Sequence, residues 1–182
     1  MGETNNTGKH KALFLDRDGV VNVDYGYVAS FDRFVFCEGI FDLLALARER
    51  GYKIVIATNQ SGIARGLFSE EAFKTLTRQT LAALRDRGII VCGVYYCPHA
   101  PEDGCDCRKP KSGLFLQAIK DHNIDPSASW MIGDKESDMT AAAGAGVKQL
   151  ILLSDKSAEK GEFFVRRKNL LDTIAYFKKA AR

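Results

Sequence analysis

Short apolar runs alternate with amphipathic segments along most of this 182-residue chain. The apolar runs share strand length and cover residues 11–15, 53–58, 91–97, 130–132 and 147–153. The segments between and after them carry apolar residues at helical spacing and cover residues 39–50, 69–87, 112–122, 138–143 and a last helix from Asn169. This alternation predicts an α/β fold, a mostly parallel sheet with helices on both faces. Functional residues in such sheets gather beyond the carboxyl ends of the strands.

Chain length and composition favour one domain. We predict a flexible tail over residues 1–10 and a single domain over residues 11–182. The net charge of +3 is too small to indicate a nucleic-acid partner by itself. No apolar run reaches membrane-spanning length and the first residues do not resemble a signal peptide, so we expect a cytoplasmic protein with no membrane partner.

Polar residues follow four of the predicted strands. Asp16 and Asp18 come after the first strand, where they form either a polar turn or a pair of carboxylates that a cation such as magnesium would hold together. Thr58 follows the second strand, and its hydroxyl and neighbouring backbone N–H groups suit phosphate oxygens. Lys109 follows the third strand and Asp134 the fourth. Each motif alone is weak, but together they predict one phosphate-transfer site.

Three cysteines and a histidine stand close together in residues 97–107, CPHAPEDGCDC. Cys97, His99, Cys105 and Cys107 are ligands that tetrahedral zinc accepts. A reduced surface loop and a disulfide pair are the alternatives. The chain has five cysteines, an odd number, which is a poor basis for a disulfide framework.

Four segments of the chain resemble the motifs of the haloacid dehalogenase (HAD) superfamily of phosphatases: FLDRDG, ATNQSG, RKPKSG and IGDKESD. Within that superfamily, VDYGYV, TNQSGIARG, YYCPH, CDCRKP and GDKESDM are similar to bacterial D-glycero-D-manno-heptose 1,7-bisphosphate phosphatases. The resemblance covers roughly residues 11–153 and implies a Rossmann-like HAD fold with a zinc-stabilised loop. No large insertion follows the first or third motif, so we expect no separate cap domain.

The resemblance implies a magnesium-dependent reaction. An aspartyl-phosphate on Asp16 would form while the 7-phosphate is removed, leaving heptose 1-phosphate for nucleotide-activated heptose and glycans such as lipopolysaccharide. Asp18 would be the general acid and base. Thr58 and Lys109 would stabilise the transferring phosphoryl group. Magnesium would bind the carboxylates of Asp16 and Asp134 and the backbone carbonyl of Asp18. Zinc would bind the cysteine and histidine residues of the 97–107 segment.

The resemblance also assigns a group of substrate-binding residues: Asp24, Tyr25, Gly26, Tyr27, Asn59, Gln60, Ser61, Arg108 and Lys135. For residues 24–27 the alternative is a surface turn. Arg65 would reach a second phosphate or else lie in solvent at a helix entry. Asp138 would order the last motif, by itself or through a metal-bound water.

Three other functions stay open from the sequence. Histidinol-phosphate phosphatases share the cysteine segment and the RKP run, but they usually carry an acid at the position of Ser61 and lack IARG, which favours the heptose enzymes. A nucleic-acid 3′-phosphatase would have similar TNQ-type motifs and a more basic surface. A non-catalytic zinc-stabilised module would lack part of the catalytic set, which is complete here. The family implies a small-molecule substrate and a monomer.

Overall fold

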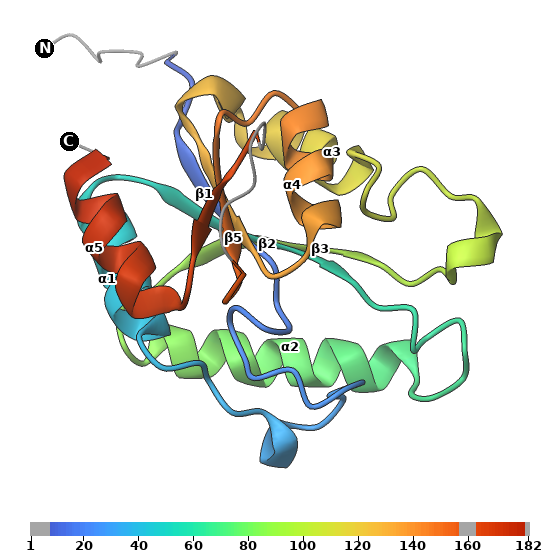
Figure 1. Cartoon of the computed structure of the whole chain (residues 1–182). Coiled ribbons are helices and arrows are strands. Elements are labelled where there is room, and N and C mark those ends of the chain that lie inside the picture. The colour runs from blue at the N-terminus through green and yellow to red at the C-terminus, as the bar shows by residue number, and fades with distance from the viewer. Residues whose placement is uncertain (1–7, 157–162, 181–182) are drawn as a thin grey trace, which may run out of the picture.

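Six parallel strands form one sheet in the computed structural model, which describes residues 8–156 and 163–180 (Figure 1). The order across the sheet is β3–β2–β1–β4–β5–β6. The strands are β1 Ala12–Leu15, β2 Lys53–Asn59, β3 Val91–Cys97, β4 Trp130–Gly133, β5 Gln149–Leu153 and β6 Val165–Arg167. The predicted parallel α/β sheet is confirmed.

Within the described residues, five α-helices and three 3-10 turns connect and cover the strands. The helices are α1 Ile40–Glu49, α2 Glu70–Arg85, α3 Gly113–His122, α4 Glu136–Gly144 and α5 Leu170–Ala180. The 3-10 turns are η1 Phe31–Arg33, η2 Pro101–Asp103 and η3 Pro126–Ala128. The start of α2 is fixed by Ser69, whose hydroxyl accepts a hydrogen bond from the backbone N–H of Ala72 at 3.1 Å.

Successive residues of the central strand point to opposite faces of the sheet, as the pleat requires. Leu13 and Leu15 join the buried cluster that includes α1, α2 and α5, whereas Ala12 and Phe14 join the cluster under α3 and α4. Figure 1 shows the two groups of helices on the two faces. All four of these β1 residues are fully buried, so the first motif follows a strand held from both sides.

The order of the strands reverses next to β1. The chain runs outward from β1 to β2 and β3, then returns to β4 on the other side of β1. In open α/β sheets, ligands bind at such a reversal, outside the carboxyl ends of the strands. The ends of β1 and β4 carry the predicted residues Asp16 and Asp134. Residues 16–39 and 98–112 carry only 3-10 turns, so no inserted domain interrupts the described ranges.

The structure differs from the sequence-based expectations at several boundaries. β6 was not expected, since Val165–Arg167 is short and contains two arginines. α4 begins at Glu136 rather than at residue 138, and β5 begins at Gln149 rather than at residue 147. The predicted tail falls mainly on residues 1–7, which lie outside the described residues, and the backbone of His10 bonds to Asn123 and Asp125. Each described helix is too short or too polar to cross a membrane.

Candidate active site

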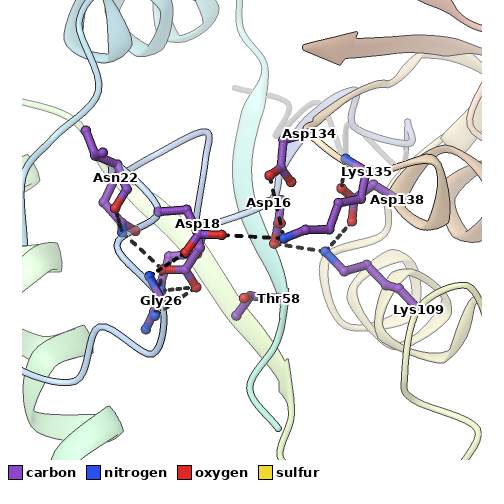
Figure 2. A network of polar contacts seen from close by, with 12 residues as sticks. Asp16, Asp18, Asn22, Gly26, Thr58, Lys109, Asp134, Lys135 and Asp138 are labelled. Atoms are coloured by element: carbon purple, nitrogen blue, oxygen red, sulfur yellow. Dashed lines mark hydrogen bonds and ion pairs between the residues drawn. The ribbon is translucent and has the colours of Figure 1, made fainter. Parts of the chain in front are cut away.

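Four strand ends bring the residues of the predicted site to one edge of the sheet. Asp16 follows β1, and Thr58 is the second-last residue of β2. Lys109 lies in the loop after β3, and Asp134 follows β4. The backbone N–H of Asp16 still bonds to the carbonyl of Ile132 at 3.0 Å, which carries the β1–β4 pairing into the motif. Figure 2 shows these side chains gathered around one point.

Lys109 is the central cation of this edge. Its Nζ lies 2.9 Å from Asp16 Oδ1, 2.5 Å from Asp138 Oδ1 and 2.8 Å from the carbonyl oxygen of Ala57. Only 3% of Lys109 is exposed. Burial lowers the pKa of Lys109, but the carboxylates of Asp16 and Asp138 outweigh that effect and hold the pKa above its ordinary value. Lys109 is therefore a buried ammonium group beside the predicted nucleophile.

Asp16, Asp134 and Asp138 form a cluster of carboxylates whose oxygens lie within 4.8 Å of one another. With Lys109 they make up what we call the sheet-edge site. Burial and then the nearby charge of Asp16 raise the pKa of Asp134 to about 7. Asp134 Oδ1 is buried without a hydrogen-bond partner among the described residues. Three converging carboxylates, one with an unpartnered oxygen, are a donor set that fits magnesium.

Gly19 is required by this cluster. Its φ is +85°, a left-handed conformation, and a Cβ built on it would lie 2.5 Å from Asp134 Oδ2. The glycine of DRDGVVN therefore allows the loop after β1 to pass close to the carboxylate after β4.

The Asp138 side chain contacts both the backbone of the last motif and the ammonium group of Lys109. Its Oδ2 accepts a hydrogen bond from the backbone N–H of Lys135 at 3.1 Å, which closes the first turn of α4 and orders the last motif. Its other oxygen pairs with Lys109. The pKa of Asp138 is raised by burial and by Asp16, against the opposing effect of Lys109. The expected ordering role agrees with these contacts.

The carboxylate of Asp18 lies outside the cluster of possible metal ligands. Its Oδ1 accepts hydrogen bonds from Arg17 and Asn22, and its Oδ2 accepts them from Arg17 and Gln60. Arg17 and Asn22 are almost completely buried. Sequence reasoning missed both residues. The available signal was an arginine two positions after a buried strand, because arginine is seldom buried unless it is paired.

A pocket of about 280 Å³ opens beside these residues. It is lined by Asp18, Asp24, Gly26, Tyr27, Asn59, Gln60, Ser61, Gly62 and Lys135. Most of the predicted substrate-binding residues therefore line one space, but Tyr25 and Arg108 do not line it. Tyr25 is 56% exposed, and Arg108 Nη1 makes a 3.4 Å contact with the carbonyl of His99.

Lys135 joins the pocket to the carboxylates. Its Nζ lies 3.7 Å from Asp24 Oδ2 and 3.5 Å from Asp134 Oδ2. Burial lowers the pKa of Lys135, but Asp134 and Asp16 raise it by more, so the side chain stays charged. Arg65, whose role was left open, donates a hydrogen bond to the hydroxyl of Tyr27 at 2.9 Å and so ties the 61–68 loop to the pocket wall.

Asn59 fixes the backbone of Lys109. Its Nδ2 donates to the carbonyl of Lys109 at 3.1 Å, and its Oδ1 accepts from the N–H of Lys109 at 3.1 Å. The side chain predicted to bind substrate thus also bridges the end of β2 and the RKP loop. This pairing spans about fifty positions of sequence, so no local pattern could have revealed it.

The cysteine loop, residues 97–107, brings its four candidate ligands together. Cys97 Sγ lies 3.5 Å from both His99 Nδ1 and Cys105 Sγ, and Cys107 Sγ lies 3.3 Å from His99 Nδ1 and 3.5 Å from Cys105 Sγ. Bonds of about 2.0–2.3 Å to one tetrahedral zinc ion would separate such atoms by roughly 3.5 Å. All three thiols are free, which excludes the disulfide alternative in this structure. The geometry fits a zinc site.

Comparisons with known proteins agree with this arrangement. The Hydrolase_like family model, described as HAD-hydrolase-like, matches residues 106–174. The chain is 51% identical over 159 residues to the D-glycero-beta-D-manno-heptose-1,7-bisphosphate 7-phosphatase of Haemophilus ducreyi, covering 84% of this chain and 87% of that protein. It is 46% identical over 170 residues to the protein of the same name from Helicobacter pylori, covering 93% and 98%.

A solved structure is similar over nearly the whole chain. It is the crystal structure of the D,D-heptose 1,7-bisphosphate phosphatase from B. bronchiseptica, complexed with magnesium and phosphate. The TM-score is 0.81 at 31% sequence identity, and the match covers 93% of this chain and 98% of that one.

Proposed function

Because the chain belongs to the D-glycero-beta-D-manno-heptose-1,7-bisphosphate 7-phosphatase family of HAD-like hydrolases, we propose that it removes the 7-phosphate of this sugar. The products are heptose 1-phosphate and inorganic phosphate, and the substrate is the β anomer that the relatives' names specify. The observation that carries the proposal is the sheet-edge site, where a buried carboxylate and a buried ammonium group meet at the strand reversal. The proposal treats residues 11–182 as one catalytic domain.

Asp16 is the nucleophile of the proposed reaction. One carboxylate oxygen attacks phosphorus, and the bond between phosphorus and the C7 oxygen breaks. Lys109 contacts this carboxylate and Thr58 lies on the neighbouring strand, so both are placed to stabilise the negative charge of the transferring phosphoryl group. Their buried positions are set before substrate arrives, which is the condition for effective charge stabilisation.

Magnesium would be held by the carboxylates of Asp16 and Asp134 and the backbone carbonyl of Asp18, and when bound it neutralises charge between nucleophile and phosphate. Asp138 stabilises this arrangement because it pairs with Lys109 and accepts a hydrogen bond from the backbone N–H of Lys135.

Asp18 transfers the protons of the two half-reactions. It gives a proton to the departing C7 oxygen while the aspartyl-phosphate forms. It then takes a proton from the water that attacks phosphorus, the bond to Asp16 breaks, and inorganic phosphate leaves. Asp18 lies on the wall of the pocket, which suits a group that must meet both the leaving oxygen and water.

Zinc has a structural role in the proposal. It would bind Cys97, His99, Cys105 and Cys107, and so fix the backbone that carries the next two residues, Arg108 and Lys109. Arg108 would then meet the phosphate that is not transferred, for which a guanidinium group is well suited.

We also propose a monomeric, cytoplasmic enzyme whose partner is a small sugar bisphosphate rather than nucleic acid. The modest net charge of +3 and a pocket of about 280 Å³ support a small substrate. Three thiol ligands in one loop need a reducing compartment. Light scattering at assay concentration checks the monomer.

A phosphate-release panel tests the proposed function. The purified protein with magnesium is given the two anomers of heptose 1,7-bisphosphate, histidinol phosphate and a 3′-phosphorylated oligonucleotide. The expected order of kcat/KM places the β anomer first. A preference for histidinol phosphate or for the oligonucleotide would overturn the substrate assignment while leaving phosphatase activity in place.

A further inference from the structure

The Asp18 carboxylate is surrounded by hydrogen-bond donors. Arg17 donates from Nε to Oδ2 at 3.1 Å and from Nη2 to Oδ1 at 2.9 Å. Asn22 Nδ2 donates to Oδ1 at 3.0 Å, and Gln60 Nε2 donates to Oδ2 at 3.0 Å. Figure 2 shows Asn22 beside Asp18, on the side away from Asp134. Both oxygens of Asp18 accept such bonds, so the position of its side chain is tightly defined.

Gln60 differs from the other donors because it also contacts the phosphate-binding motif. Its Nε2 lies 2.9 Å from Thr58 Oγ1 as well as 3.0 Å from Asp18 Oδ2. The amide of Gln60 faces Asp18 with its NH₂ group, which donates to Asp18 Oδ2. The second N–H of the same group then points to the Thr58 hydroxyl, which must accept it. The hydrogen of that hydroxyl is left for another acceptor.

Gln60 is held firmly enough to act as a fixed spacer. The residue is 4% exposed and Thr58 is 1% exposed. The backbone N–H of Gln60 donates to the carbonyl of Cys97 at 2.7 Å, which fixes the backbone of Gln60 against the last residue of β3. The residue is therefore anchored at its backbone and bonded at its amide.

We propose that Gln60 is a positioning residue that fixes the Asp18 carboxylate for proton transfer and turns the Thr58 hydroxyl to donate to the transferring phosphoryl group. This inference rests on the proposed function, in which Asp18 protonates the leaving oxygen. Each residue of the TNQ segment then has its own role in the proposed reaction. Thr58 contacts phosphate, Asn59 fixes the Lys109 backbone, and Gln60 fixes the Asp18 side chain. One tripeptide at the end of β2 thus sets the positions of two catalytic groups on other loops.

The test is Gln60→Leu, which keeps the approximate size of the side chain and removes its donors. We expect kcat/KM for the heptose bisphosphate to fall about 10- to 100-fold, with the loss in kcat and KM nearly unchanged. We expect a several-fold smaller loss for 4-nitrophenyl phosphate, because its leaving group departs as a stable anion without a proton. Gln60→Glu keeps the shape and should lose at least as much activity, since an ionised carboxylate cannot donate to Asp18.

Two results would overturn the inference. A rise in KM with kcat unchanged would make Gln60 a substrate contact, and an equal loss on both substrates would make its role only structural. In an Asp18→Asn background, Gln60→Leu should lower kcat/KM for the sugar phosphate by a smaller factor than in the wild type, because only its effect through Thr58 remains. A loss as large as in the wild type would contradict the inference, because the Asp18 side chain that Gln60 positions no longer transfers a proton.

The matched control is Gln117→Leu. Gln117 Nε2 donates to Asp121 Oδ1 at 2.8 Å on an exposed face of α3, so the same kind of bond is removed away from the site, and both activities should stay at the wild-type level. If the wild type does not hydrolyse heptose bisphosphate but cleaves another alkyl phosphate from the panel, the proposed function fails. The role of Gln60 is then tested in the same way, by comparing the loss of activity on that alkyl phosphate with the loss on 4-nitrophenyl phosphate.

Discussion

The sheet-edge site and the cysteine loop are both suited to a metal ion, but the chain builds them in opposite ways. The sheet-edge site collects Asp16, Lys109, Asp134 and Asp138 from distant parts of the sequence and needs the whole sheet to form. The cysteine loop takes all four ligands from residues 97–107. The first site depends on long-range topology, and the second on a short loop that a metal can close.

The two sites also differ in what holds them without a metal. At the sheet edge, Lys109 already pairs with two of the three carboxylates, so a protein cation provides part of the charge balance. In the cysteine loop, each ligand contacts other ligands at 3.3–3.5 Å, and no protein cation pairs with them among the described ion pairs. We therefore expect the sheet-edge site to keep its shape when magnesium is removed and the cysteine loop to lose its shape when zinc is removed.

The largest effect is expected from Asp16→Asn. Loss of the nucleophile should lower kcat by about 10⁴-fold or more. The amide oxygen can still accept from Lys109, so the thermal unfolding temperature should stay close to that of the wild type. Phosphate release and circular dichroism measure the two quantities. Wild-type activity from the folded variant would refute the nucleophile assignment.

Lys109→Met separates catalysis from charge balance. We expect kcat to fall about 10²- to 10³-fold because the phosphoryl charge loses a fixed cation. We also expect the free energy of unfolding to fall by about 3–5 kcal/mol, since Asp16 and Asp138 are left as buried unpaired carboxylates. Urea unfolding without magnesium measures the second effect.

Asp138→Asn is the matched comparison for the lysine variant, because it removes one charge of the same pair and leaves Lys109 with Asp16. It should cost less stability than Lys109→Met. A lysine variant as stable as the wild type would contradict the view that a protein cation supports this site.

Removal of zinc tests the other half of the comparison. Metal analysis should find about one zinc per chain. Cys107→Ser should lose that zinc, disorder the cysteine loop and weaken substrate binding by about 10- to 100-fold, with a smaller change in the unfolding of the sheet. Cys92→Ser, on β3 outside the loop, is the control and should keep its zinc. An equally active, metal-free Cys107→Ser protein would remove the basis for the zinc site.

The smallest effect concerns the pH dependence of the magnesium-free protein. Burial and Asp16 raise the pKa of Asp134 from 3.8 to about 7 in the folded state. Ionising Asp134 therefore costs stability, and this cost grows as the pH rises from about 4 to above 7. Asp134→Asn should raise the unfolding temperature by a few degrees at pH 8 and have little effect at pH 5. The same small change at both pH values would contradict the charge crowding inferred here.

The comparison also shows which features the sequence could predict. The grouping of the cysteine loop and of the candidate residues after each strand could be predicted, because ligand spacing and strand–motif order are local properties of the chain. The parallel sheet followed from the alternation of elements. Each candidate zinc or magnesium ligand could be proposed from its residue type and its position within a motif.

Other features depended on contacts between distant residues. The bond between Asn59 and the Lys109 backbone, and that between Gln60 and Asp18, appear only once β1, β2 and the RKP loop are placed together. β6 was missed because its three residues gain strand structure from pairing with β5, not from their own pattern. α4 begins two residues earlier than expected, where the Asp138 side chain accepts a hydrogen bond from the backbone N–H of Lys135.

In the proposed mechanism, Asp16 carries the phosphoryl group during turnover. The most direct measurement uses heptose bisphosphate labelled in its 7-phosphate, with acid quenching within one turnover and mapping of the labelled peptide. We expect label on Asp16, a larger labelled fraction in Asp18→Asn because water attack is slowed, and no label in Asp16→Asn. Label on another residue, or release of labelled phosphate with no labelled protein in either active form, would contradict it.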